Sequence, residues 1–131
     1  MIPFRIVLGR PVHHAFVTDS WVSCDRDAPD GWRSRGLSIS AAKGIVRGIL
    51  GASTVELRIA CVPDDDEAIL GWACLEPSVV HYIYLRAKFG VAGTDGAAML
   101  RRLLERMRGP GEYTHQPGGK MRIPRGWTYA A

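Results

Sequence analysis

The chain has 131 residues, of which 47% are hydrophobic, and its 17 Lys and Arg against 13 Asp and Glu give a net charge of +4. This length suits one domain, and the apolar content argues against an intrinsically disordered chain. No apolar run approaches the ~20 residues of a membrane span, and we recognise no signal peptide. We therefore expect a single cytoplasmic domain over residues 1–131 that is not embedded in a membrane.

In chain order, the first part of the sequence predicts one strand and two helices. These elements cover residues 2–8, 13–23 and 38–50, with an acidic loop at 24–36 between the helices. The strand assignment depends on the β-forming run IPFRIVL, and the helices depend on apolar residues at helical spacing. Ser38 or Ser40 can cap the second helix.

The next part predicts a β-hairpin and a third strand. The strands are expected at 54–62, 68–75 and 79–85, and an acidic turn at 63–67 joins the first two. The segment VVHYIYL at 79–85 is almost wholly β-branched or aromatic. Such continuous apolarity is typical of a central strand that is covered on both faces.

A glycine-rich loop follows this strand and leads into a helix predicted at 94–107, with short strands near the end of the chain. The predicted apolar face of that helix consists of Ala97, Leu100, Leu103, Leu104 and Met107. Glycines let backbone N–H groups approach an anion closely, and a helix N-terminus carries partial positive charge. The loop therefore suits a phosphate-bearing ligand, although a turn that only connects strand to helix explains the same residues.

The three cysteines, Cys24, Cys61 and Cys74, lack the close spacing of a zinc or redox site. Cys61 and Cys74 lie in apolar runs, where a free cysteine behaves as a small buried hydrophobe. The sequence therefore predicts free thiols in a reducing compartment and no metal cofactor.

The order of the predicted elements resembles that of the GNAT (Gcn5-related N-acetyltransferase) superfamily. The matching block is ILGWACLEPSVVHYIYLRAKFGVAGTDGAAMLRRLL, residues 69–104. Leu70-Gly71-Trp72, Ile83-Tyr84-Leu85, Phe89 and Gly93 fall at the family's motif positions. The resemblance implies an α/β, GNAT-like fold: a mixed, mostly antiparallel central sheet of about six strands, flanked by three to four helices.

Shorter motifs resemble the small GNAT-like proteins of phages and prophages. They are DSW at 19–21, YTH at 113–115 and GWTY at 126–129. In such folds, loops early in the chain and near its end set the acceptor, which here implies residues 24–36 and 116–125. Terminal strands of this kind are compatible with a homodimer.

The resemblance implies an acyl-CoA-dependent N-acyltransferase that moves an acetyl group from acetyl-CoA to a primary amine by direct attack. Backbone groups of Ile83, Tyr84 and Leu85 would pair with the pantetheine arm of the donor. The donor's phosphates would lie against the residues that follow the strand: Arg86, Lys88, Gly90, Val91, Ala92, Gly93, Thr94, Asp95 and Gly96. Gly90 stands where the family has an arginine.

A primary amine must lose a proton before it attacks a thioester, so this reaction requires a general base. His81 is the first candidate, because the ordinary histidine pKa of about 6.5 suits a base near neutrality. Glu76 is the second, and by resemblance Tyr113 or Tyr129 would protonate the leaving thiolate. Each also has a structural interpretation, as a hydrogen-bonded core histidine, a solvated carboxylate or a packed tyrosine.

The alternative hypothesis is a GNAT-like phage protein without catalysis that acts as a binding or nucleic-acid-associated module. A DNA-modifying variant lies between the two hypotheses. The argument for nucleic acid is a group of arginines on the last helix: Arg101, Arg102, Arg106 and Arg108. A solvated helix face explains these arginines equally well, so nucleic acid is the less favoured partner.

Overall fold

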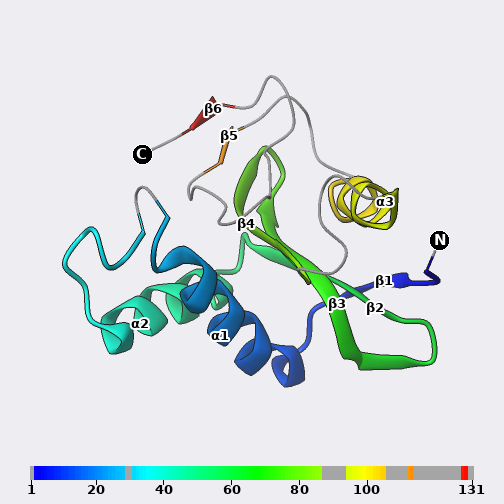
Figure 1. Ribbon diagram of the computed structural model, residues 1–131, viewed down its shortest axis with the longest axis horizontal. Helices are drawn as coiled ribbons and strands as arrows, with labels where there is room; N and C mark the ends of the chain where they lie inside the picture. The colour runs from blue at the N-terminus through cyan, green and yellow to red at the C-terminus, as the bar shows by residue number, and fades with distance from the viewer. Residues whose placement is uncertain (1, 29–30, 87–93, 106–111, 114–127, 130–131) are drawn as a thin grey trace.

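The computed structural model describes residues 2–28, 31–86, 94–105, 112–113 and 128–129, and every structural statement below concerns them. At positions 94, 95, 112, 113, 128 and 129 only the backbone is described. Figure 1 shows a twisted sheet with helices α1 and α2 against one face and helix α3 against the other.

The elements follow one another in the predicted order. They are β1 (Arg5–Leu8), a 3₁₀ turn η1 (Pro11–His13), α1 (His14–Asp25), α2 (Ile39–Leu50), β2 (Glu56–Val62), β3 (Asp65–Glu76), β4 (Val79–Leu85), α3 (Thr94–Leu103), β5 (Glu112–Tyr113) and β6 (Thr128–Tyr129). Among these described helices, none has the length and apolarity that crossing a bilayer requires.

Within the described residues the sheet has six strands in the order β1 to β6. The first four strands pair antiparallel, while β5 and β6 are two residues long and pair parallel to their neighbours. The predicted α/β architecture, with a mixed and mostly antiparallel sheet, is confirmed.

Most element boundaries lie within a few residues of their predicted places. The strand predicted at 79–85 is confirmed to the residue as β4. The predicted acidic turn is too long, because β2 and β3 continue to pair as far as Val62 and Asp65, which leaves a turn of two residues. α3 ends at Leu103, and Met107 lies outside the described residues.

Two clusters of buried apolar side chains lie on the two faces of the sheet. The first joins α1 and α2 to the strands, and at its centre the rings of Trp21, Trp72 and Tyr82 have centroids between 5.3 and 5.8 Å apart. The second joins α3 to the opposite face. Tyr82 belongs to the first cluster and Ile83 to the second, which confirms β4 as a strand covered on both faces.

The helix caps and faces agree only in part with the prediction. Ser38 caps α2, and its hydroxyl accepts a backbone N–H at 3.1 Å, as predicted. The apolar face predicted for α3 is wrong at Ala97, which is exposed. The helix instead packs on the sheet through Met99 and Leu103, which are one turn apart and fully buried.

All three cysteines are free thiols, as predicted. Cys24 is exposed, whereas Cys61 and Cys74 are buried in the sheet. Burial raises the pKa of the Cys74 thiol to about 12, so this side chain stays protonated at neutral pH and behaves as part of the apolar core.

Gly71 lies where β3 approaches β4 too closely for a side chain. A Cβ there would lie 2.7 Å from both Leu85 Cδ2 and the backbone oxygen of Tyr84. We expect Gly71→Ala to lower the free energy of unfolding by about 1–3 kcal/mol, because β4 must move away. Thermal unfolding measures this loss.

Gly44→Ala is the matched control, since a Cβ at this exposed position in α2 meets nothing within 4 Å. It should stabilise the protein by roughly 0.5–1 kcal/mol, because alanine favours a helix interior over glycine. Equal effects at the two positions would contradict the close approach of β3 to β4.

Candidate functional site

The pairing of β3 with β4 is interrupted at His81. Cys74 lies opposite Tyr82 and Leu75 lies opposite Val80, so His81 is an extra residue on β4 with no Cα partner in this register. Such a β-bulge bends the strand and changes the direction of its side chains, and bulges are enriched next to active sites.

The bulge also marks a change at the other edge of β4. The ladder between β4 and β5 joins Val79 to Glu112 and Val80 to Tyr113. Beyond His81, no strand among the described residues pairs with the β5-facing edge of Ile83, Tyr84 and Leu85. We call this stretch of backbone the open edge.

His81 and Glu76 form a hydrogen-bonded pair at this position. Glu76 ends β3, and its Oε2 lies 2.9 Å from Nε2 of His81. Because an ionised carboxylate only accepts hydrogen bonds, Nε2 of His81 is the donor in this pair. The His81 side chain is 14% exposed and the Glu76 side chain is 29% exposed, so the pair is partly sheltered but still reachable from solvent.

Thr54, in the turn before β2, completes the environment of Glu76. A hydrogen bond from Thr54 lowers the pKa of the Glu76 carboxyl below its ordinary value, and the hydrogen bond from His81 adds to the effect. Glu76 is therefore ionised at neutral pH, and it can orient the ring and stabilise positive charge on it.

This lowered pKa predicts how stability depends on pH. Because the pKa is lower in the folded chain, ionised Glu76 contributes stability above its ordinary value, and this contribution disappears as pH falls through the folded value. We expect Glu76→Gln to unfold at a lower temperature than the wild type at pH 7. The difference should shrink towards pH 3, and a difference that stays constant with pH would contradict the prediction.

The structure places the predicted donor-binding residues of β4 on the open edge. Ile83 and Leu85 pack into the second cluster, and the Tyr84 ring lies against Phe16 and Trp72 on the opposite face, so the backbone of all three is held from both sides. Among the described residues, no strand pairs with this edge, so its backbone groups are the ones that could pair with a further strand.

Arg86, at the end of β4, is held in place by two contacts. Its Nε donates to the backbone oxygen of Ile69 at 2.7 Å, and its guanidinium lies 5.6 Å from the centroid of the Phe16 ring. Its other guanidinium nitrogens, Nη1 and Nη2, are further N–H donors of the type that bind anions.

Several predicted residues cannot be placed. Those outside the described residues are Lys88, Gly90, Val91, Ala92 and Gly93. α3 begins with Thr94 and Asp95, described by backbone only, and Gly96 is the first of its residues known to be buried. Their role in binding a donor stays a prediction.

The two tyrosine candidates lie on neighbouring short strands. Tyr113 of β5 is opposite Val80, the residue before His81, and Tyr129 of β6 is opposite Tyr113. Their backbones thus lie beside the His81 bulge, with Tyr113 the nearer of the two along the sheet.

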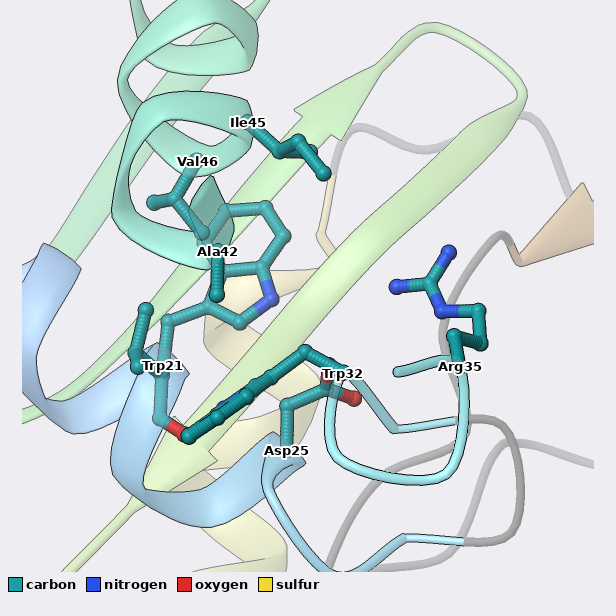
Figure 2. Close-up of a pocket in the computed structure, with 8 residues that line it drawn as sticks. Trp21, Asp25, Trp32, Arg35, Ala42, Ile45 and Val46 are labelled. Atoms are coloured by element: carbon teal, nitrogen blue, oxygen red, sulfur yellow. The ribbon is translucent and has the colours of Figure 1, made fainter. Parts of the chain in front are cut away.

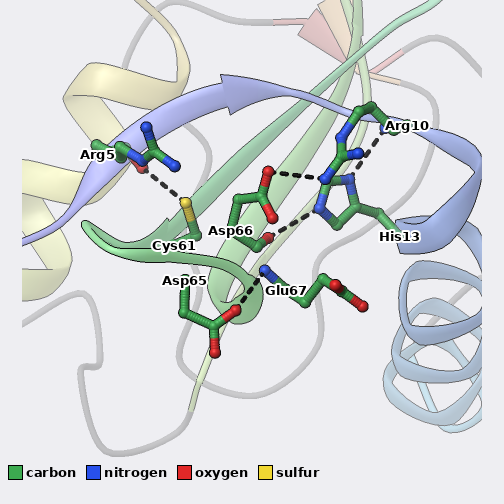
Figure 3. Close-up of polar contacts among 7 residues, drawn as sticks. All are labelled: Arg5, Arg10, His13, Cys61, Asp65, Asp66 and Glu67. Atoms are coloured by element: carbon green, nitrogen blue, oxygen red, sulfur yellow. Dashed lines mark hydrogen bonds and ion pairs between the residues drawn. The ribbon is translucent and has the colours of Figure 1, made fainter.

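The acidic hairpin between β2 and β3 has a structural role. Asp66 Oδ2 lies 2.7 Å from an Arg10 guanidinium nitrogen, and the Asp66 backbone oxygen lies 2.8 Å from Nε2 of the buried His13. Figure 3 shows these residues and their contacts. Nδ1 of His13 accepts the Arg10 N–H at 3.0 Å. These contacts tie the start of α1 to the hairpin, and no group of metal-binding side chains occurs among the described residues.

Two hollows near α1 and α2 do not include the His81–Glu76 pair. The one in Figure 2 lies beneath Trp21, Trp32 and Arg35 and has room for a single water molecule at most. The other is an open groove between the start of α1 and the end of α2, lined in part by Thr18 and Arg47.

The arginines that favoured nucleic acid are only partly described. Arg101 and Arg102 are exposed on α3, while Arg106 and Arg108 lie outside the described residues. Arg102 already contacts Glu105 at 3.4 Å and lies 6.0 Å from the centroid of the Phe4 ring. Part of this positive charge is therefore neutralised within the chain.

Two features of the site escaped the sequence. No local signal identifies Thr54 as a partner of Glu76, because the two are 22 positions apart and meet only through the pairing of β2 with β3. The bulge at His81 also has no marker such as a glycine, since VVHYIYL has the pattern of an ordinary strand.

The arrangement around β4 agrees with the resemblance of the sequence. Two helices follow β1, the β2–β3 hairpin precedes β4, and α3 follows it. The described part of β5 pairs in parallel with only the first two residues of β4, Val79 and Val80. The fold is GNAT-like.

Neither protein-family models nor curated protein sequences match the chain. Among solved structures, a protein assigned to the GNAT acetyltransferase family from Desulfovibrio desulfuricans matches with a TM-score of 0.49 and 18% identity, over 79% of this chain and 65% of that one. A probable acetyltransferase matches with a TM-score of 0.48 and 15% identity, over 77% and 71%.

A transcriptional regulator from Bacillus halodurans C-125 is similar to the same extent, with a TM-score of 0.47 and 15% identity over 79% of this chain and 73% of that one. What the GNAT-like chain does must be argued from its own site.

Proposed function

We propose that the chain is an acyl-CoA-dependent N-acyltransferase in which His81, oriented by Glu76, removes a proton from a primary amine. The observation that carries the proposal is the 2.9 Å pair between the two side chains at the β4 bulge, directly before the open edge. A base and a strand edge able to bind an extended donor thus occur next to each other.

The chemistry follows from the protonation state of the pair. Nδ1 of His81 takes a proton from the acceptor ammonium, and the ionised Glu76 stabilises the resulting positive charge on the ring. The amine nitrogen then forms a bond to the thioester carbon as the carbon–sulfur bond breaks. Tyr113 is the proposed donor of a proton to the departing thiolate, and the second proton that the nitrogen loses on becoming an amide replaces the one that Tyr113 gave.

The open edge fits the donor that this reaction needs. The pantetheine arm of acetyl-CoA contains amide groups, which can pair with the backbone of Ile83, Tyr84 and Leu85 as a further strand would. The cationic Arg86 stands at the end of the same edge, on the side where phosphates would follow. Acetyl-CoA is the co-substrate in this proposal, and no metal takes part in it.

The first test is binding of acetyl-CoA to the full chain. A ligand present at about 100 times its dissociation constant stabilises a protein by roughly 2.7 kcal/mol, so the unfolding temperature should rise by several degrees. A panel of primary amines, with release of the CoA thiol as readout, then identifies the acceptor class. No thermal shift at millimolar acetyl-CoA would overturn the proposal.

Desulfo-CoA, which lacks the thiol, serves as a control for binding without transfer. It should raise the unfolding temperature as acetyl-CoA does but release no thiol. The single-domain organisation, the cytoplasmic location, the homodimer and the phage resemblance stay predictions that this test does not address.

A further inference from the structure

Arg58 is a buried charged residue in β2, a strand whose other residues are apolar except for Glu56 at its start. It lies in β2 opposite Ala73 of the second cluster, and only 6% of the residue is exposed. Burying a guanidinium is costly unless its donors are bonded, so its partners indicate why this position tolerates an arginine.

Those partners connect the sheet to α3. Nη1 of Arg58 donates to the backbone oxygen of Leu103 at 3.1 Å, while Nε and Nη2 each lie 3.3 Å from Oε2 of Glu56. Leu103 is the last residue of α3, so its carbonyl lacks a partner within the helix. A cation at this end of a helix also interacts favourably with the helix dipole.

The contact with Arg58 sets the position of α3 along its own axis, which the apolar face of the helix cannot do. The hydrophobic contacts of Met99 and Leu103 are non-directional, so they hold the helix against the sheet without setting its position along its axis. A hydrogen bond from a buried side chain to the helix end sets that position. Met99 and Leu103 share the second cluster with Ile83 and Leu85, whose backbone forms the open edge.

We infer that Arg58 is a positioning residue for acyl-CoA binding, acting through α3 on the open edge of β4. The inference depends on the proposed function, because the open edge is the part of the chain that would bind the donor. Arg58 itself lies on the far side of β3 from β4, and its hydrogen bonds go to α3 and Glu56 and not to His81 or Glu76.

The test compares the full chain with Arg58→Gln and Arg58→Lys. Gln is too short and neutral to replace the contact, whereas Lys keeps a cation that can reach the Leu103 carbonyl. We expect acetyl-CoA to bind Arg58→Gln at least about tenfold more weakly by calorimetry, and Arg58→Lys to give an intermediate dissociation constant. In the ligand-free protein, amide hydrogens of α3 should exchange faster in Arg58→Gln than in the wild type.

Val46→Ala is the matched control, since this residue is equally buried but lies in α2 and the first cluster. It should destabilise the protein without changing the dissociation constant per folded molecule or the exchange of α3. Wild-type affinity or wild-type α3 exchange in Arg58→Gln would overturn the inference. If Arg58→Gln does not fold, Arg58→Lys is the test. We then expect about threefold weaker binding of acetyl-CoA and faster exchange of the α3 amides. Wild-type values of both would overturn the inference.

The wild-type titration separates this inference from the proposed function. If the wild type binds acetyl-CoA and the variants bind it equally well, only the role of Arg58 fails. If the wild type itself does not bind acetyl-CoA, the proposed function fails and the role of Arg58 fails with it.

Discussion

Replacing His81 by alanine is expected to lower the rate of acetyl transfer by about 100- to 10,000-fold, the usual contribution of a positioned general base. The dissociation constant of acetyl-CoA should stay within twofold of the wild-type value, because the backbone groups proposed to pair with the donor lie beyond the bulge. Release of the CoA thiol, measured with the best acceptor of the amine panel, reports the rate, and calorimetry reports the binding.

His14→Ala is the matched control for this experiment. His14 begins α1 and contributes to neither the His81–Glu76 pair nor the open edge, so its loss should leave turnover unchanged. Glu76→Gln should give an intermediate rate, because the ring keeps a hydrogen-bond partner but loses the adjacent negative charge. Wild-type turnover in His81→Ala would show that another group is the base.

Replacing Trp72 by alanine is expected to cost about 3–5 kcal/mol of unfolding free energy, the range for truncation of a buried tryptophan. Trp72 is fully buried, its ring packs against Trp21 and Tyr82, and its Nε1 donates to Ser20 Oγ at 2.9 Å. For a chain of this size the unfolding temperature should fall by about 10 °C or more.

Val12→Ala provides the surface comparison, since Val12 is 50% exposed and should change stability by no more than about 0.5 kcal/mol. Trp72→Phe keeps an aromatic ring but loses the bond to Ser20, so its effect should be smaller than that of alanine. A loss below about 1 kcal/mol in Trp72→Ala would contradict the central place of this ring in the first cluster.

The secondary structure was largely predictable because its signals are local. VVHYIYL forms β4 at its predicted bounds, since β-branched and aromatic side chains suit a strand covered on both faces. Ser38 caps α2 because a serine hydroxyl can accept a free N–H of the first helical turn. The face of α3 was misjudged at Ala97, because spacing alone does not say which apolar side chains reach the sheet.

The candidate site was predictable as residues but not as an arrangement. His81 and Glu76 were separate candidates, and their hydrogen bond depends on the turn between β3 and β4 and on the bulge that offsets their pairing. A bulge results from the packing of both faces at once, so no single stretch of sequence encodes it. Arg58 likewise has no local signal in the sequence, because its contact with the end of α3 depends on the tertiary structure.

The 131 residues alone were enough to predict one strand, two helices, a hairpin, a central strand and a further helix in this order. These features depend on the periodicity of apolar residues over short stretches, which the sequence displays directly. The tertiary structure decided which distant groups meet: Glu76 with His81 and Thr54, and Arg58 with Leu103. Such contacts depend on strand register and helix placement, which are set by the packing of the whole chain.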